Sequence, residues 1–243
     1  MKEKIKIVPN GDSGMSIVFE KGISEDINSS VHHLAKGIAE ADITGVVDIV
    51  PAYHTLLICY NPLDISYMTL KEQVMQVCEQ DYSKSEKSRI VIHIPVLYGG
   101  EWGEDIETVA SHNDLTIDEV ISMHSSVMYR VYMLGFKPGF PYLGGMSDQL
   151  ATPRLARPRL KILKGSVGIA GRQTGIYPQD SPGGWQLIGR TPLELVDWSK
   201  EELTIIEPGQ YIKFDPIDKE GFEAIEEAVR LGTYTLDIEC LEE

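Results

Sequence analysis

The chain has 243 residues and a mass of 27.1 kDa, which suits one or two domains, and we predict two. Hydrophobic residues make up 42% and charged residues 24%, a composition that excludes global disorder. A formal charge of −15 disfavours nucleic acid and anionic membranes as partners, and the absence of a long apolar run leads us to expect a cytoplasmic protein.

The first predicted domain, residues 1–82, alternates β-type runs with two amphipathic helical patterns. Residues 5–8 and 15–19 flank a turn signal and predict a hairpin. Ser24 has the form of an N-cap, and Thr69 to Glu72 has the form of a capping box near the start of a second helix. Two further strands are predicted at residues 46–50 and 55–60. The order resembles a ferredoxin-like α/β sandwich.

A polar stretch at residues 83–88 predicts a linker, and residues 89–243 form the second predicted domain. It opens with a strand at 89–96, and the capping box from Thr116 to Glu119 begins a helix that places His124 near its C-terminal end. Short strand candidates separated by Gly and Pro then predict a β-barrel; they are 127–134, 166–170, 185–189, 193–197 and 211–214. An amphipathic stretch from Phe222 to Val229 predicts a closing helix.

Positive charge and glycine are concentrated between His124 and Pro192. That window holds nine basic and two acidic residues, with 11 of the 22 glycines and 7 of the 13 prolines. Glycine lets backbone N–H groups approach an oxyanion, and arginine can hold the same oxyanion through two hydrogen bonds. An anion pocket is therefore one interpretation. The alternative is that glycines and prolines turn the barrel corners while the cations pair with acidic surface.

Known chemical motifs are mostly excluded by the spacing. The glycines at 165, 168 and 171 fit neither a dinucleotide fingerprint nor a phosphate loop, and no metal site is predicted. Phe140 and Tyr142 either line an apolar ligand pocket or belong to the core. His124 is titratable near neutrality and suits proton transfer, although the residue alone favours a core or helix-end role.

Three long motifs resemble one family. They are GFKPGFPYLGGM at 135–146, PRLARPR at 153–159 and GSVGIAGRQTGIYPQDSPGGWQLIGRTP at 165–192. With PAYHTLLICYNP at 51–62, they make nearly the whole chain similar to the family of the 5-oxoprolinase B subunit, also known through KipI and as the first subunit of allophanate hydrolase.

The resemblance implies an α+β fold in which a cyclophilin-like β-barrel follows the ferredoxin-like domain. It also implies a role as the B subunit of an ATP-dependent 5-oxoprolinase, which opens 5-oxo-L-proline to L-glutamate together with the A subunit, and with the C subunit, a paralogous barrel. ATP is the co-substrate of that complex, and the implied route is phosphorylation of the amide oxygen followed by hydrolysis. We expect the chain to be inactive alone, because it lacks a nucleotide-binding motif combined with a clear base.

Site residues follow from the same resemblance. The expected catalytic residues are His124, Arg159 and Gln173. Residues expected to bind substrate or phosphate are Arg154, Lys164, Arg172, Ser181, Arg190, Phe140 and Tyr142. The chain departs from the family pattern at Lys164 and Arg172, where each departure adds a cation that either strengthens phosphate binding or fills the pocket.

Two other functions remain open at this stage. The first is a KipI-type inhibitor that binds a sensor histidine kinase and blocks its autophosphorylation, which requires an exposed surface instead of a reacting centre. The second, less favoured, is membership of a urea- or allophanate-degrading system.

Overall fold

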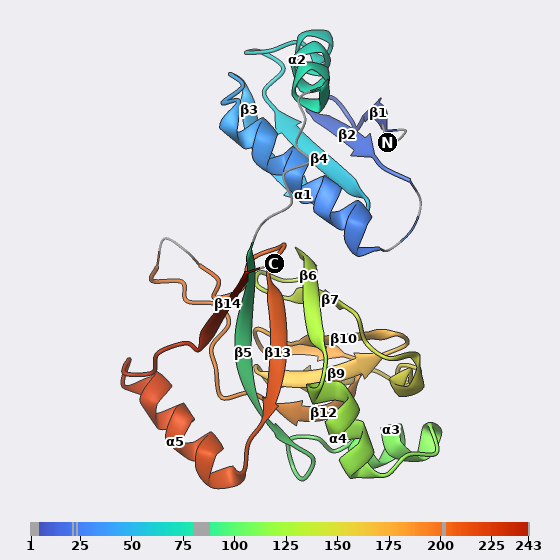
Figure 1. Cartoon of the computed structure of the whole chain (residues 1–243), viewed down its shortest axis with the longest axis vertical. Helices are drawn as coiled ribbons and strands as arrows, with labels where there is room; N and C mark the ends of the chain where they lie inside the picture. Colours follow the sequence, from blue (N-terminus) through green and yellow to red (C-terminus); the bar gives the residue numbers. More distant parts are fainter. Residues whose placement is uncertain (1–4, 21, 23, 80–87, 201–202, 243) are drawn as a thin grey trace. The chain divides into compact units, whose positions relative to one another are not determined.

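The computed structural model describes residues 5–20, 22, 24–79, 88–200 and 203–242. The chain divides into two compact units, residues 1–87 and 88–243 (Figure 1). All but the last residue of the expected linker, 83–88, lies outside the described residues, and Ser88 begins the first strand of the second unit.

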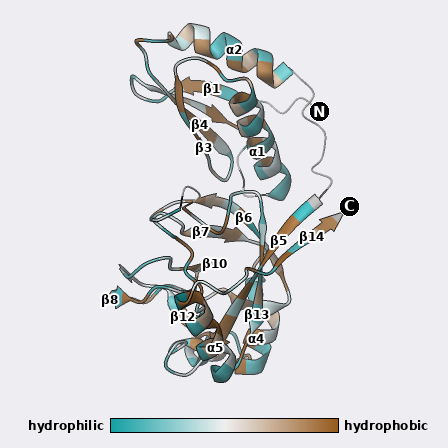
Figure 2. Cartoon of the chain, turned by 90° about the vertical axis from the view of Figure 1, so that its left-hand side faces the viewer, coloured by the Kyte–Doolittle hydropathy of each residue, from teal (hydrophilic) through white to brown (hydrophobic). Residues whose placement is uncertain are grey.

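The first unit is a sheet with two helices on one face. Its elements are β1 (Lys6–Pro9), β2 (Gly14–Val18), α1 (Glu25–Glu40), β3 (Val46–Pro51), β4 (Thr55–Tyr60) and α2 (Tyr67–Glu79). The strands are antiparallel in the order β1-β2-β4-β3. Alternate residues of β2 and β4, among them Ile17 and Ile58, are buried with Val31 of α1 and Val74 of α2. The strands are mostly hydrophobic, whereas the helices carry residues of both kinds (Figure 2).

Local capping explains where these helices begin. The Ser24 hydroxyl accepts a hydrogen bond from the Ile27 N–H, as its N-cap form predicts. The second helix begins near the expected position: α2 starts at Tyr67, two residues before Thr69, and the Ser66 hydroxyl accepts from the Thr69 N–H at 3.1 Å. The serine just before the helix therefore satisfies the Thr69 N–H, one of the N–H groups that a helix start leaves without an intrahelical partner.

The second unit is built on a strongly bent sheet. Its strands are β5 (Ser88–Tyr98), β6 (Met128–Leu134), β7 (Pro141–Gly144), β9 (Ser166–Ala170), β10 (Gln173–Ile176), β12 (Gln186–Arg190), β13 (Tyr211–Pro216) and β14 (Ile238–Glu242). The order is β10-β9-β12-β5-β13-β6-β7, with β14 paired to β5. The end strands β7 and β10 lie against each other, so the sheet nearly closes into a barrel. This architecture confirms the predicted α+β class.

Helices and a separate ribbon complete the second unit. The helices are α3 (Ile106–His112), α4 (Ile117–Ser125) and α5 (Lys219–Arg230), and β8 (Arg159–Ile162) pairs with β11 (Ser181–Gly183) outside the barrel. The capping box of Thr116 and Glu119 begins α4 as predicted. The strand expected at 193–197 is absent from the described residues, where only an isolated bridge joins Val196 to Thr204.

His93 on β5 forms ion pairs with carboxylates on β13 and on the C-terminal strand β14. Its Nδ1 lies 2.7 Å from Asp215 Oδ2 on β13, and its Nε2 lies 3.5 Å from Glu239 Oε2 on β14. Burial lowers the pKa of His93. The hydrogen bonds and the charge of these carboxylates together raise it by a larger amount, so the net pKa lies above its ordinary value. The protonated ring therefore stabilises the packing of β14 on β5.

We expect this contribution to depend on pH. Because the pKa of His93 is higher in the folded chain than in the unfolded chain, the stabilisation is complete below about pH 6.5 and is lost as the pH rises through the raised value. The charged contacts should be worth about 1 kcal/mol. Thermal unfolding from about pH 6 to about pH 8.5 should show a fall in Tm that His93→Gln reduces. An identical pH profile in the two proteins would contradict this assignment.

Candidate functional site

The Gly- and Pro-rich segments singled out in the sequence meet around Asp180. The Lys137 ammonium donates to the Asp180 carbonyl at 3.3 Å, and the Lys164 N–H donates to Asp180 Oδ1 at 2.9 Å. Lys161 Nζ of the β8 strand lies 2.9 Å from Asp180 Oδ2. The hydrogen bonds from Lys161 and Lys164 lower the pKa of Asp180, which therefore stays ionised and joins segments 135–141, 159–165 and 177–181.

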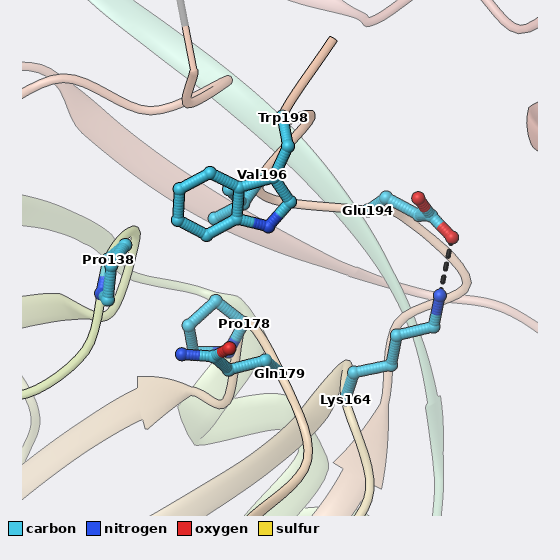
Figure 3. Close-up of a pocket in the computed structure, with 7 residues that line it drawn as sticks. All are labelled: Pro138, Lys164, Pro178, Gln179, Glu194, Val196 and Trp198. Carbon is cyan, nitrogen blue, oxygen red and sulfur yellow. Dashed lines mark hydrogen bonds and ion pairs between the residues drawn. The ribbon is translucent and has the colours of Figure 1, made fainter.

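A pocket of about 170 Å³ opens between these segments (Figure 3). It is lined by Pro138, Lys164, Pro178, Gln179, Glu194, Val196 and Trp198. Val196 and Trp198 face Pro178 and Gln179 across it, while Pro138 lies at one end and the pair of Lys164 and Glu194 at the other. Gly139 has a φ of +78°, and a Cβ there would lie 2.3 Å from Val196 Cγ2, so this wall requires glycine.

The chemistry of the pocket suits a small ring that carries a negative charge. Proline, valine and tryptophan side chains supply the apolar walls, and the Gln179 amide supplies a donor and an acceptor. Lys164 Nζ lies 2.5 Å from Glu194 Oε1, which uses one of the three ammonium donors and leaves two for a ligand. Trp198 is 66% exposed and forms the outer wall.

An aromatic cluster includes Phe140 and Tyr177, which are close in sequence to Pro138 and Pro178 of the pocket lining. The Phe140 ring contacts the rings of Tyr142, Tyr177 and Trp185 at centroid distances of 5.4, 5.6 and 5.5 Å. Phe140 is 2% exposed, and Tyr142 packs at the margin of the cluster. Of the two aromatic roles left open by the sequence, the structure favours the core role, since neither ring lines the pocket.

His124 does not lie at a surface where a substrate could reach it. Its side chain is fully buried, its Nδ1 lies 2.8 Å from the Tyr98 hydroxyl, and its Nε2 lies 2.8 Å from Thr174 Oγ1. Burial lowers its pKa to about 3, so the ring is neutral. The expected proton-transfer role is therefore not supported, and the core role that the residue alone favoured describes its position.

The Arg159 guanidinium binds other groups of the protein. Its Nη2 lies 2.8 Å from Asp105 Oδ1, its Nε lies 2.9 Å from Glu104 Oε1, and its Nη1 donates to the Trp185 carbonyl at 3.4 Å. Burial lowers the pKa of Arg159, but these carboxylates raise it above its ordinary value. Arg159 thus ties the β8–β11 ribbon to the rest of the second unit, and all three of its nitrogen atoms contact protein groups.

Two of the other expected cations lie apart from the pocket. Arg154 is placed with its guanidinium carbon 5.9 Å from the centre of the Trp185 ring. Arg172 is exposed and forms a two-pronged ion pair with Asp148. Arg154, Arg159 and Arg172 therefore do not converge on one recess, because each makes its own local contacts.

The last three expected residues occupy different positions. Gln173 begins β10 and is half-buried. Ser181 on β11 is 4% exposed, and its hydroxyl has no hydrogen-bond partner among the described residues. Arg190 ends β12 and shares with Lys164 the lining of a second, larger cleft. Only Lys164 of the expected site residues lines the pocket of Figure 3.

Sequence reasoning missed most of the pocket lining. Pro138, Pro178 and Gln179 lie inside the quoted motifs, so their position in GFKPGFP and IYPQD was the available signal. Glu194, Val196 and Trp198 follow the last motif and carried no signal of their own. Over the described ranges, neither a helix suited to crossing a membrane nor a cluster of His, Cys, Asp and Glu suited to a metal is found.

Comparisons with known proteins agree over most of the chain. Residues 5–206 match the family described as carboxyltransferase domain, subdomain C and D. The chain is 41% identical to the 5-oxoprolinase B subunit of Bacillus subtilis, over 93% of this chain and 99% of that protein. It is 40% identical to the protein of the same name from Escherichia coli O157:H7, over 87% and 95% of the two chains.

Solved structures show the same fold. TTHA0988 superposes with a TM-score of 0.75 at 36% identity, over 84% of this chain and 40% of that longer chain. The urea amidolyase of K. lactis superposes with a TM-score of 0.77 at 19% identity, over 99% of this chain and 16% of that one, and this likeness concerns the fold alone.

Proposed function

Because the chain belongs to the family of the 5-oxoprolinase B subunit, within the carboxyltransferase subdomain C and D proteins, we propose that it serves as the B subunit of an ATP-dependent 5-oxoprolinase. In this complex it acts with the A and C subunits to open 5-oxo-L-proline to L-glutamate. The observation that carries the proposal is 41% identity extending over 99% of the Bacillus subtilis relative. A match of this length covers both units of the chain, not one domain.

The pocket of Figure 3 is the proposed binding site for the lactam. The five-membered ring lies between Pro178 and the Trp198 indole, which supply apolar contact. The lactam N–H and carbonyl match the acceptor and donor of the Gln179 amide. The Lys164 ammonium binds the carboxylate, and its pairing with Glu194 holds it at the pocket end.

ATP does not fit this pocket. A triphosphate requires several cations or a loop of backbone N–H groups, whereas Lys164 is the only cation among the described residues that line the pocket, and Glu194 neutralises part of its charge. The glycine spacing in 165–171 is also not that of a phosphate loop. We therefore assign nucleotide binding to another member of the complex and derive no step through ATP on this chain.

The proposal is tested by reconstitution. The chain is purified alone and with the A and C subunits, and 5-oxoproline-dependent ADP release and glutamate formation are measured. We expect turnover only in the complete set, because this chain lacks a nucleotide site of its own. Turnover by the isolated chain would contradict the shared-site part of the proposal, and an assembled complex without turnover would contradict the function.

Two pocket variants should separate binding from chemistry. Lys164→Ala and Trp198→Ala each remove a ground-state contact, so we expect KM for 5-oxoproline to rise about tenfold, or about 1.4 kcal/mol, with kcat within about twofold. Arg172→Ala, which removes an exposed cation outside the pocket, is the matched control. A normal KM in both pocket variants would exclude this pocket as the substrate site.

A further inference from the structure

A second cleft of about 540 Å³ lies between segment 190–194 and helix α5. It shares Lys164 and Glu194 with the pocket of Figure 3, so one ion pair borders both spaces. The cleft is lined on the barrel side by Arg190 and on the helix side by Glu223, Glu226, Glu227 and Arg230. Groups of both signs therefore surround it.

Arg190 presents a fixed guanidinium to this cleft. Its Nε donates to the Lys164 carbonyl at 3.0 Å, and its guanidinium carbon lies 4.4 Å from the centre of the Trp102 ring. Trp102 itself stacks on Phe222 of α5 at 6.1 Å. Within the described part of the chain, Nη1 and Nη2 make no hydrogen bond. The Arg190 guanidinium is thus held by the hydrogen bond of Nε and by the Trp102 ring on one face. Its two terminal nitrogens can bind the two oxygens of a carboxylate.

The Glu226 carboxylate lines the same cleft and carries a charge opposite to that of Arg190. Its neighbour Glu227 pairs with Arg230 at 2.6 Å, and Glu223 lies 3.9 Å from Lys219. Glu226 makes no such contact among the described residues, and it does not pair with Arg190 although both line the same cleft. Over the residues that the structure describes, the cleft is thus bordered by a guanidinium with two unpaired nitrogen atoms and by an unpaired carboxylate, and these two groups do not pair with each other. Such a cleft matches a ligand that carries both charges.

We propose that this cleft binds a zwitterionic α-amino acid, with the carboxylate on the Arg190 guanidinium and the ammonium on the Glu226 carboxylate. Four glutamates among the described residues of the lining disfavour a polyanion such as a nucleotide, and Arg190 disfavours a simple cation. The identity of the amino acid rests on the proposed function: adding water across the lactam bond creates an ammonium and a second carboxylate, so L-glutamate fits the cleft and 5-oxoproline does not.

Binding is tested on the purified full chain without its partners. L-glutamate and 5-oxo-L-proline are titrated separately, with calorimetry for affinity and the Trp102 indole N–H signal as a local NMR reporter, because Trp102 contacts Arg190. We expect L-glutamate to bind in the millimolar range, since Glu226 is exposed and Arg190 is half-buried, and to shift the Trp102 signal. Equal binding of the two ligands at this reporter, or no saturation by L-glutamate in that range, would overturn the proposal.

Matched variants locate the ligand. Glu226→Gln and Arg190→Gln should each weaken L-glutamate binding about tenfold, whereas Glu220→Gln, an exposed change on the same helix outside the cleft, should not. Arg190→Gln also removes a contact that holds α5, so Glu226→Gln keeps the test independent of folding. Unchanged affinity in Glu226→Gln would overturn the assignment. Because these are binding measurements, their result is separate from whether the complete complex turns over 5-oxoproline.

Discussion

Replacing His124 by alanine is expected to destabilise the second unit by about 3–5 kcal/mol. The imidazole is fully buried, and its ring packs on Phe214 at a centroid distance of 4.5 Å. Its loss creates a cavity and leaves the Tyr98 hydroxyl and Thr174 Oγ1 without their partner. Both effects are large because the site lies in the core, where bulk water does not reach the two hydroxyl groups that lose a partner.

The hydrogen bonds around His124 define its protonation. Thr174 Oγ1 donates to the Gly168 carbonyl at 3.1 Å, so it accepts from His124 Nε2–H. Nδ1 is therefore the acceptor for the Tyr98 hydroxyl. The Tyr129 hydroxyl donates to the His124 carbonyl at 2.8 Å, which joins the end of α4 to β6. The neutral ring thus connects helix α4 with strands β5 and β10, and the His124 carbonyl adds the link to β6.

Denaturant unfolding measures this effect, with His112→Ala as the exposed histidine control that should change stability by less than about 0.5 kcal/mol. The acid side gives a second readout. Because the pKa of His124 is lowered from 6.5 to about 3, its contribution is present above about pH 6.5 and is lost at about 1.4 kcal/mol per pH unit as the pH falls toward 3. A stable His124→Ala protein that unfolds in acid as the wild type does would refute this account.

The regular elements could be predicted where the local sequence determines them. The capping box at Thr116, the N-cap at Ser24 and the apolar spacing of 222–229 each act within one helix, so the pattern contains the whole signal. Helix α3 was missed because it is short and the Asp105 side chain does not cap it. That carboxylate binds Leu187 N–H and Arg159 instead, contacts that span more than 50 residues.

The candidate site shows the same limit. The motifs contain three of the seven residues that line the pocket, because glycine and proline requirements such as that of Gly139 are local. Lys164 directly precedes the last motif, whereas Glu194, Val196 and Trp198 follow it. Which cations are free could not be predicted, since their partners are distant in sequence: Lys164 pairs with Glu194 and Arg172 with Asp148. The nine basic and two acidic residues of this window therefore indicated a local positive charge, but not whether the basic side chains share one pocket.

Replacing Asp105 by alanine should have the second-largest effect, about 3 kcal/mol on stability. The Asp105 side chain is 10% exposed, and it accepts from Arg159 Nη2 at 2.8 Å and from the Leu187 N–H at 2.7 Å. Its removal leaves a buried N–H without an acceptor. Among the described residues, it also leaves Arg159 with Glu104 as its one remaining acidic partner. The exposed Arg230→Ala, which breaks a surface ion pair with Glu227, is the control and should cost less than about 1 kcal/mol.

The same change distinguishes positioning from catalysis at Arg159. Arg159 begins β8, and Lys161 of that strand contacts Asp180, which joins the loops around the pocket. If Arg159 acts only by anchoring this ribbon, Asp105→Ala and Arg159→Ala should lower turnover of the reconstituted complex to a similar degree, and the double variant should be no worse than either. If the guanidinium instead contacts the substrate, Arg159→Ala should lower kcat far more than Asp105→Ala, and the two losses should add. The first pattern is expected, because the Nε, Nη1 and Nη2 atoms of Arg159 all bind protein groups.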